Sequence, residues 1–231
     1  MKRLTLFLDA DDTLFDFDAA ETAAVSLLFK DYDFLKYKGI VPLYKENNLK
    51  CWKALERGEI TRPQVAKLRF KWTFDNYNIE FSDYDTLNQQ YWVYLGQQTI
   101  TLKGAEDFLK KIYKDNDLYI VTNGTTHVQN NRFKLSGLDK YFIKRFISEQ
   151  IGFQKPSKEF FDYVEKELNG IDRENAYIIG DSLTSDMKAG VNANIKTIWF
   201  NIKKDEIGDS KVDFEVHSYD ELYNLIENLR K

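Results

Sequence analysis

Apolar and polar positions alternate in blocks along this chain of 231 residues. Short apolar runs rich in β-branched and aromatic residues predict strands that are buried on both faces, as in a parallel sheet. The predicted strands are Lys2–Leu8, Leu118–Val121, Arg145–Ser148, Ala176–Ile179, Thr197–Phe200 and, more weakly, Asp213–Val216. Apolar residues at helical spacing predict helices between them, at Ala105–Tyr113, Val128–Leu135, Lys158–Leu168 and Thr184–Ala193. This alternation indicates a doubly wound α/β fold.

The region 19–98 breaks the alternation, because it contains several amphipathic helical patterns and no convincing strand. Thr61–Gln64 has the form of a capping box with a proline in the first turn, and Ser82–Asp85 is a second helix start. We therefore predict a catalytic core formed by 1–18 and 99–231, with an all-helical cap domain inserted at 19–98. An insertion that leaves the sheet after its first strand would cover the strand ends as a lid.

Composition and charge restrict the partners that we expect. The 37 acidic and 33 basic residues give a net charge of −4, which offers no general attraction to a nucleic acid polymer or an anionic membrane. No apolar segment approaches the roughly 20 residues of a membrane helix. The single cysteine, Cys51, cannot form an internal disulfide, which fits a reducing compartment and predicts a cytoplasmic protein. Nothing in the sequence indicates a protein partner.

Polar and charged residues follow four of the predicted strands. They are Asp9, Asp11 and Asp12 after the first strand, Thr122 and Asn123 after the second, Lys155 after the third, and Asp181 and Asp186 after the fourth. In open α/β sheets, ligands bind beyond the carboxyl ends of the strands, so we expect these groups to converge. Carboxylates crowded at one strand end repel each other unless a cation or a reaction makes use of them.

This set of residues has a coherent chemistry. Asp9 and Asp11 are separated by one residue, so in an extended chain they point to the same side. One carboxylate can attack phosphorus to form an aspartyl-phosphate, while the other protonates the leaving oxygen and then activates water. Mg²⁺, which prefers oxygen ligands, would let the anionic carboxylate approach an anionic phosphate, with Asp181 and Asp186 as further ligands. Lys155 would balance the charge of the transferring group.

The four groups of residues that follow these strands resemble the pattern of haloacid dehalogenase (HAD) superfamily phosphatases that carry a helical C1 cap. That pattern runs Asp-x-Asp-x-Thr, then Ser/Thr, then Lys, then Gly-Asp with a second acid a few residues later. The resemblance implies that Asp9 is the nucleophile and Asp11 the general acid/base, with a carbonyl oxygen of Asp11 also touching the metal. It implies phosphate binding by Thr122, Asn123 and Lys155, and a Mg²⁺ site formed by Asp9, Asp11, Asp181 and Asp186, the last in a supporting position.

The resemblance extends to the branch that includes pyrimidine 5′-nucleotidases. Asp12 stands where most relatives carry glycine, and this choice, together with Thr122–Gly124 and Gln129, is similar to that branch. It implies hydrolysis of small soluble phosphate monoesters, with a pyrimidine nucleoside 5′-monophosphate as the expected substrate. A sugar-phosphate phosphatase or phosphomutase of the same superfamily stays open, as does a noncatalytic binding module on this fold. A dehalogenase is disfavoured because it has no need of Asp11.

Aromatic residues are frequent in the predicted cap and could stack on a nucleobase. They are Trp52, Phe70, Trp72, Phe74, Tyr77, Tyr91, Trp92 and Tyr94. Most of them are expected in the core of the helical region, because packed helices need large apolar side chains at helical spacing. Arg69 could contact substrate, although a surface ion pair is the more common role of such a residue.

Overall fold

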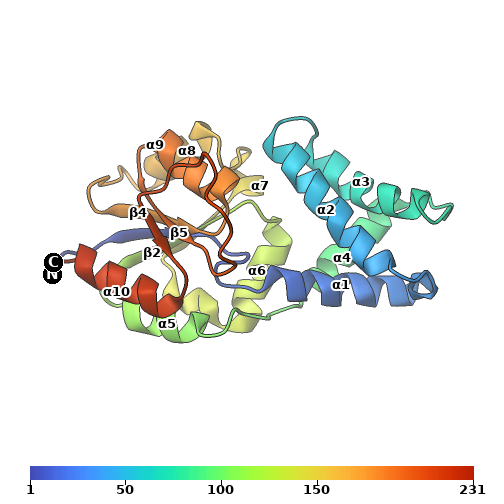
Figure 1. The fold of residues 1–231 in the computed structure, drawn as a ribbon, viewed down its shortest axis with the longest axis horizontal. Helices are drawn as coiled ribbons and strands as arrows, with labels where there is room; N and C mark the ends of the chain where they lie inside the picture. Colours follow the sequence, from blue (N-terminus) through green and yellow to red (C-terminus); the bar gives the residue numbers. More distant parts are fainter.

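The computed structural model describes all residues, 1–231, and shows an elongated molecule with two unlike ends (Figure 1). One end contains a sheet with helices on both faces, and the other consists of helices alone. Both chain termini lie at the sheet end, far from the all-helical end. None of the helices is both long enough and apolar enough to cross a bilayer.

The sheet has six strands in the order β3-β2-β1-β4-β5-β6, and every neighbouring pair is parallel. The strands are β1 (Thr5–Leu8), β2 (Asp117–Thr122), β3 (Lys144–Ile147), β4 (Ala176–Gly180), β5 (Lys196–Phe200) and β6 (Phe214–Val216). The prediction of a doubly wound parallel sheet is confirmed. The first strand is shorter than predicted, since it begins at Thr5 and not at Lys2.

Six helices accompany the sheet. They are α5 (Ala105–Ile112), α6 (Thr126–Ser136), α7 (Ser148–Ile151), α8 (Lys158–Glu167), α9 (Lys188–Ala193) and α10 (Tyr219–Leu229), with a short 3₁₀ turn at Leu138–Tyr141. Of these, α5, α6, α8 and α9 lie within a few residues of predicted helices, whereas α7 and α10 were not predicted. The helix predicted at Thr184–Ala193 is divided, because its first turn is a π-helix at Leu183–Met187 and only the remainder is α9. α6 ends at Gly137, whose φ of 72° is the left-handed conformation that glycine adopts readily.

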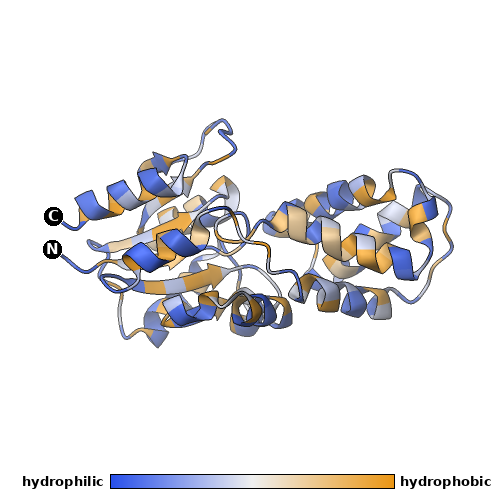
Figure 2. Ribbon diagram, turned by 90° about the horizontal axis from the view of Figure 1, so that it is seen from below, coloured by the Kyte–Doolittle hydropathy of each residue, from blue (hydrophilic) through white to orange (hydrophobic).

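Apolar side chains fill both faces of the sheet. In β1, Leu6 and Leu8 pack with α5, α6 and α10 on one face, while Phe7 packs with α8 and α9 on the other. Alternate residues of a strand point to opposite faces, so a strand covered on both sides must be apolar throughout. Figure 2 shows this arrangement as hydrophobic strands between helices whose outer faces are hydrophilic.

Four helices form the other end of the molecule, which we call the helical unit. They are α1 (Phe17–Asp31), α2 (Ile40–Glu56), α3 (Arg62–Asp75) and α4 (Tyr84–Gly96), with a short 3₁₀ turn at Phe34–Lys36. The predicted capping box is present, since the backbone N–H of Thr61 donates to Gln64 Oε1 at 2.7 Å. The next helix is capped by Asp83, one residue later than the predicted start at Ser82.

The helical unit has a hydrophobic core of its own, rich in aromatic rings. Phe29 lies at its centre, with ring centroids 5.8 Å from Tyr44, 6.5 Å from Phe70 and 6.0 Å from Phe74. Phe70 and Phe74 therefore serve in packing, as the helical spacing predicted for most of the aromatic residues. The core explains why this region forms helices that hold together away from the sheet.

Replacing Phe29 by alanine should lower the free energy of unfolding by about 3–5 kcal/mol, because it leaves a cavity among several rings. Chemical denaturation followed by circular dichroism measures this change. Phe153→Ala is the matched control, since Phe153 is 49% exposed and its loss should change stability by less than about 0.5 kcal/mol. Equal effects of the two substitutions would contradict the assignment of Phe29 to a packed core.

Candidate active site

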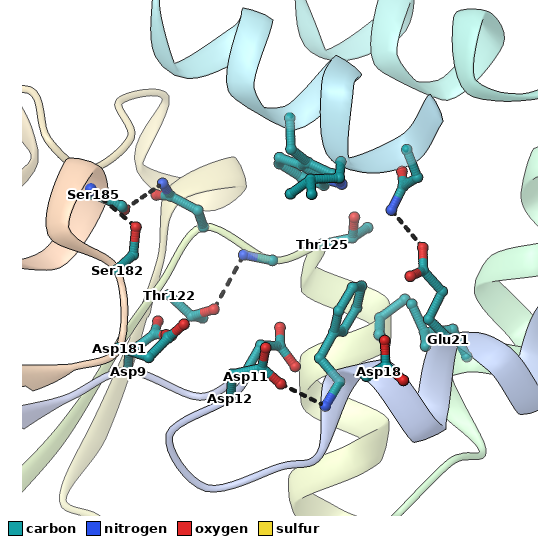
Figure 3. Close-up of a pocket in the computed structure, with 18 of the residues that line it drawn as sticks. Asp9, Asp11, Asp12, Asp18, Glu21, Thr122, Thr125, Asp181, Ser182 and Ser185 are labelled. Carbon is teal, nitrogen blue, oxygen red and sulfur yellow. Dashed lines mark hydrogen bonds between the residues drawn. The ribbon is translucent and has the colours of Figure 1, made fainter. Parts of the chain in front are cut away.

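The residues predicted for the site converge on one cavity at the carboxyl ends of β1, β2 and β4 (Figure 3). The cavity has a volume of about 460 Å³, within the range of small-molecule sites. The predicted site residues that line it are Asp9, Asp11, Thr122, Asn123, Lys155, Asp181 and Asp186. β1 lies between β2 and β4 in the sheet, which brings their carboxyl ends together from distant parts of the sequence.

Lys155 is the charged group at the base of this cavity. Its side chain is 1% exposed, and its Nζ donates to Asp9 Oδ1 at 2.7 Å, to the Val121 carbonyl at 2.7 Å and to Asp186 Oδ1. Asn123 holds the lysine backbone, because its amide donates to the Lys155 carbonyl at 2.8 Å and accepts from the Lys155 N–H at 2.9 Å. Burial of an ammonium is tolerable only with such partners.

Asp9 and Asp186 pair with this lysine, and a third carboxylate, Asp181, lies next to them, so the negative charge of the cluster exceeds the single positive charge. Oxygens of Asp9, Asp181 and Asp186 lie within 4.8 Å of one another. Burial raises the pKa of Asp9 to about 7, although Lys155 lowers it, and the carboxylates of Asp186 and Asp11 raise it further. Burial also raises the pKa of Asp181 well above its usual range, followed by repulsion from Asp186 and Asp9. Oxygen ligands with excess negative charge fit a hard divalent cation.

A glycine makes room for Asp186. A Cβ on Gly180, the last residue of β4, would lie 2.3 Å from the Asp186 carboxyl carbon, which no side chain could accommodate. The Asp186 carboxylate also accepts a hydrogen bond from the Ser182 N–H at 3.1 Å. The π-helical turn that contains Asp186 thus folds back against the strand end and places this carboxylate beside Lys155.

Asp11 is held by two residues of α6 that the sequence analysis did not assign to the site. Gln129 Nε2 donates to Asp11 Oδ2 at 2.7 Å, and the fully buried guanidinium of Arg132 forms an ion pair with Asp11 Oδ1. The Asp11 side chain therefore faces α6 and is not part of the cluster of Asp9, Asp181 and Asp186. Gln129 and Arg132 are three residues apart in the helix predicted after the second strand, so they lie on one face of that helix. This shared face was the sequence feature that could have indicated their joint role.

The aspartates near Asp11 have structural roles. Asp12 adopts a left-handed φ of 53°, which aspartate tolerates better than most residues and which explains why glycine would also fit. Its carboxylate accepts from the Phe17 N–H at 3.1 Å and pairs with Lys203 at 2.8 Å. Asp16 caps α1 by accepting from the Ala19 N–H at 2.9 Å.

The far side of the cavity is formed by the helical unit and carries a polar group. Glu21, Asn48 and Arg69 line the cavity there and are all buried. Asn48 Nδ2 donates to Glu21 Oε1 at 2.6 Å, and Arg69 Nη1 donates to Asn48 Oδ1 at 3.3 Å. The expectation of a surface ion pair for Arg69 is wrong, because the residue is only 3% exposed and its guanidinium lies 4.4 Å from the ring centre of Tyr91.

Burial of Glu21 changes its acidity. Removal from water raises the pKa of Glu21 to about 7, although Arg69, the hydrogen bond from Asn48 and the charge of Lys45 oppose this shift. The carboxylate has no direct ion pair with Arg69, since the amide of Asn48 lies between the two groups. Among the aromatic residues predicted for the cap, Trp52, Tyr91 and Trp92 line the cavity.

Polar contacts join the helical unit to the loops of the site. Arg62 donates from Nη2 to the Asn123 carbonyl at 2.8 Å and to the Ser148 hydroxyl. Lys53 Nζ donates to Thr184 Oγ1 at 2.9 Å. These contacts hold α2 and α3 over the strand ends, so that the cavity is bounded by both ends of the molecule.

Comparison with known proteins places this arrangement in a family. Residues 4–194 match the sequence model of the haloacid dehalogenase-like hydrolases. The chain is 39% identical to the HAD-hydrolase YfnB of Bacillus subtilis, over 98% of this chain and 97% of YfnB. It is 38% identical to the pyrimidine 5′-nucleotidase PynA of Streptococcus pneumoniae, over 96% of this chain and 94% of PynA. It is 32% identical to the pyrimidine 5′-nucleotidase YjjG of Escherichia coli, over 87% of each chain.

A solved structure agrees with these matches. The crystal structure of YfnB from Bacillus subtilis, which is bound to magnesium and reveals interdomain movement, superimposes with a TM-score of 0.91 over 98% of this chain and 99% of that chain. The chain belongs to the haloacid dehalogenase-like hydrolases. Its sequence and fold therefore support an enzyme of the phosphatase and 5′-nucleotidase kind, and members of this family generally use a divalent metal.

The raised pKa of Glu21 predicts a pH-dependent stability difference. The folded state keeps the Glu21 proton up to about pH 7, whereas the unfolded state loses it near pH 4.5, so the free energy of unfolding should fall as the pH rises between these values. Glu21→Gln removes this titration. Between pH 5 and pH 8 the variant should gain about 1–3 kcal/mol relative to the wild type, as measured by urea denaturation.

The control for this measurement is Glu80→Gln, which changes an exposed glutamate of the same region. Its stability difference from the wild type should stay constant across the pH range. If Glu21→Gln also gave a constant difference, the Glu21 carboxyl would have an ordinary acidity, and the account of its burial would be wrong.

Proposed function

We propose that the protein is a Mg²⁺-dependent phosphomonoesterase that hydrolyses pyrimidine nucleoside 5′-monophosphates through an aspartyl-phosphate. The observation that carries this proposal is the cluster of three carboxylates, two of them paired with buried Lys155, in a cavity bounded by the helical unit. Two relatives that are named pyrimidine 5′-nucleotidases, PynA and YjjG, support the choice of substrate. Location in the cytoplasm stays a prediction.

The residues present fit a magnesium ion. Asp9, Asp181 and Asp186 supply oxygens within 4.8 Å of one another, and burial makes their shared negative charge unfavourable without a cation. The Asp11 side chain is paired with Arg132, so any contribution of Asp11 to the metal would come from its backbone carbonyl. When bound, the ion supplies positive charge that reduces repulsion between carboxylate and phosphate.

Asp9 and Asp11 would divide the chemistry of the two steps. In the first step, Asp9 attacks phosphorus and the P–O bond to the sugar breaks, while Asp11 gives a proton to the leaving oxygen. In the second step, Asp11 takes a proton from water as the water oxygen attacks the aspartyl-phosphate, which releases phosphate and restores Asp9. Both side chains line the same cavity, two residues apart at the end of β1.

Thr122 and Lys155 are suited to hold the phosphoryl oxygens. Lys155 already donates to Asp9, so its ammonium lies beside the atom that would carry the phosphoryl group. The Thr122 hydroxyl accepts from the Gly124 N–H at 3.1 Å, which leaves its own proton for an acceptor such as phosphate. The Asn123 side chain is engaged with the Lys155 backbone, which favours a positioning role over direct contact with phosphate.

We further propose that 1–18 and 99–231 form the catalytic core and that 19–98 acts as a cap that opens and closes over the cavity. Support comes from the hydrophobic core of the helical unit, to which the sheet end contributes only Val128 of α6, and from the few polar contacts that join the unit to the loops of the site. Closure would exclude bulk water from the acyl phosphate and admit only small substrates.

A phosphate-release assay tests this function. With Mg²⁺, uridine or thymidine 5′-monophosphate should give a kcat/KM well above that of sugar phosphates, and chelation should abolish turnover. Asp9→Asn should lower kcat by at least about 1,000-fold, because it removes the nucleophile. Asp162→Asn, an exposed aspartate that pairs with Lys158, is the control and should keep full activity. Equal rates with sugar phosphates, or an active Asp9→Asn variant, would contradict the proposal.

A further inference from the structure

The helical unit contains a buried polar network to which each of its four helices contributes one side chain. Glu21 comes from α1, Asn48 from α2, Arg69 from α3 and Asn88 from α4, and none is more than 5% exposed. Arg69 donates to both asparagines, and Asn48 donates to Glu21. Such a network in an otherwise aromatic core is unfavourable unless each group has a partner.

The network is incomplete, and three of its four members line the cavity. Glu21, Asn48 and Arg69 line the cavity, whereas Asn88 lies behind them. Arg69 Nε is buried and donates to no group in the protein. Glu21 uses Oε1 to accept from Asn48, and its other carboxylate oxygen accepts no hydrogen bond from the chain. A purely structural network would be expected to pair the carboxylate with the guanidinium directly, and this one does not.

The network and the cluster of Asp9, Asp181 and Asp186 lie at opposite sides of the cavity. This arrangement suits a ligand with two chemically different ends. In Figure 3, Asp9 and Asp181 lie on one side of the pocket and Glu21 on the other, with Asp11 between them. The first side fits phosphate, since it carries Lys155 and Thr122. The second side offers an anionic acceptor, nitrogen donors and the aromatic walls of Trp52 and Tyr91, which fit a planar polar ring.

We infer that Glu21, Asn48 and Arg69 form the base-recognition site of this enzyme and that they select a ring whose N–H lies between two carbonyl groups, as in uracil and thymine. The inference rests on the proposed nucleotidase function and names the residues that determine its specificity. In this assignment the free Glu21 oxygen accepts the ring N–H, and the unpaired Arg69 Nε and the amide of Asn48 are the nitrogen donors for the flanking carbonyls.

This assignment explains why the protein keeps a buried carboxylate whose ionisation is unfavourable. The high pKa of Glu21 results from loss of water, and a donor on the ligand would replace the lost hydrogen bond. Above about pH 7, where Glu21 is ionised, cytosine would leave the carboxylate unsatisfied, because it has a lone pair where uracil has the N–H. Rejection of such an analogue is strong when the buried polar group of the site then has no partner.

The test compares substrates with and without a base in the Mg²⁺-loaded enzyme. Glu21→Gln should lower kcat/KM for uridine 5′-monophosphate by about 10- to 100-fold, the range expected for loss of a hydrogen bond to a charged group. Its kcat/KM for ribose 5-phosphate should stay within about twofold of the wild type, because that substrate does not reach Glu21. Glu80→Gln, exposed in the same region, should change neither value.

Equal losses for both substrates would show that Glu21 acts only on folding or on cap closure, and unchanged values would show that it does not contact the base. Either result overturns the inference and leaves the phosphomonoesterase proposal standing. The Glu21→Gln variant is expected to fold, since glutamine keeps an acceptor for Asn48 and, above about pH 7, the substitution removes an unfavourable buried charge.

A second measurement keeps the inference separate from catalysis. Calorimetry with uridine, which has no phosphate, should show binding to the wild-type protein that weakens at least tenfold in Glu21→Gln. If the enzyme failed to hydrolyse nucleotides while uridine bound in this way, the proposed function would fail and the base site would stand. Absence of uridine binding to the wild type, together with no preference for nucleotide over ribose 5-phosphate, would overturn the base site.

Discussion

The ion pairs of buried Lys155 with Asp9 and Asp186 are the interaction on which the site depends. One ammonium cannot neutralise the three carboxylates of Asp9, Asp181 and Asp186, so the strand ends keep excess negative charge in a place with little water. Without a cation this arrangement works against folding. In the proposed function, a divalent cation would balance these charges and let a phosphate group approach them.

The sheet topology determines where this charge collects. The central position of β1, between β2 and β4, brings groups from distant parts of the chain to one edge. Because the chain forms the helical unit directly after β1, that unit remains close to the edge and supplies the opposite wall of the cavity. The two ends of the molecule therefore contribute different chemistry to one cavity, with carboxylates and Lys155 on the sheet side and Glu21, Asn48 and Arg69 on the helical side.

The sequence was sufficient to predict the fold and the polar residues that lie at the carboxyl ends of the strands, because both follow from local patterns. Apolar runs of strand length and the Thr61–Gln64 capping box are determined by neighbours in the chain, and the prediction of each is confirmed within a few residues. Asp9 and Lys155 could be associated because strand ends in a parallel sheet share one edge. The divided helix at Leu183–Met187 was missed, since a π-turn depends on how Asp186 folds back against Gly180.

The residues that sequence analysis missed are those whose roles depend on packing between helices. Arg132 is an ordinary helix residue by pattern, and only the packing of α6 near the end of β1 brings it to Asp11. Arg69 was expected at the surface, because a single charged residue in a helix is usually solvated. Its burial with Glu21 requires the arrangement of four helices, which periodicity alone does not determine.

The most direct test of the account is a crystal structure of the protein with Mg²⁺ and beryllium trifluoride, a mimic of a phosphoryl group attached to a carboxylate. The account predicts beryllium bonded to an Asp9 oxygen, a magnesium ion ligated by Asp9 and Asp181, and Lys155 Nζ within hydrogen-bond distance of a fluorine. Beryllium trifluoride bound elsewhere, or a magnesium ion that avoids these carboxylates, would contradict the claim that excess charge around Lys155 exists to hold a metal and a phosphoryl group.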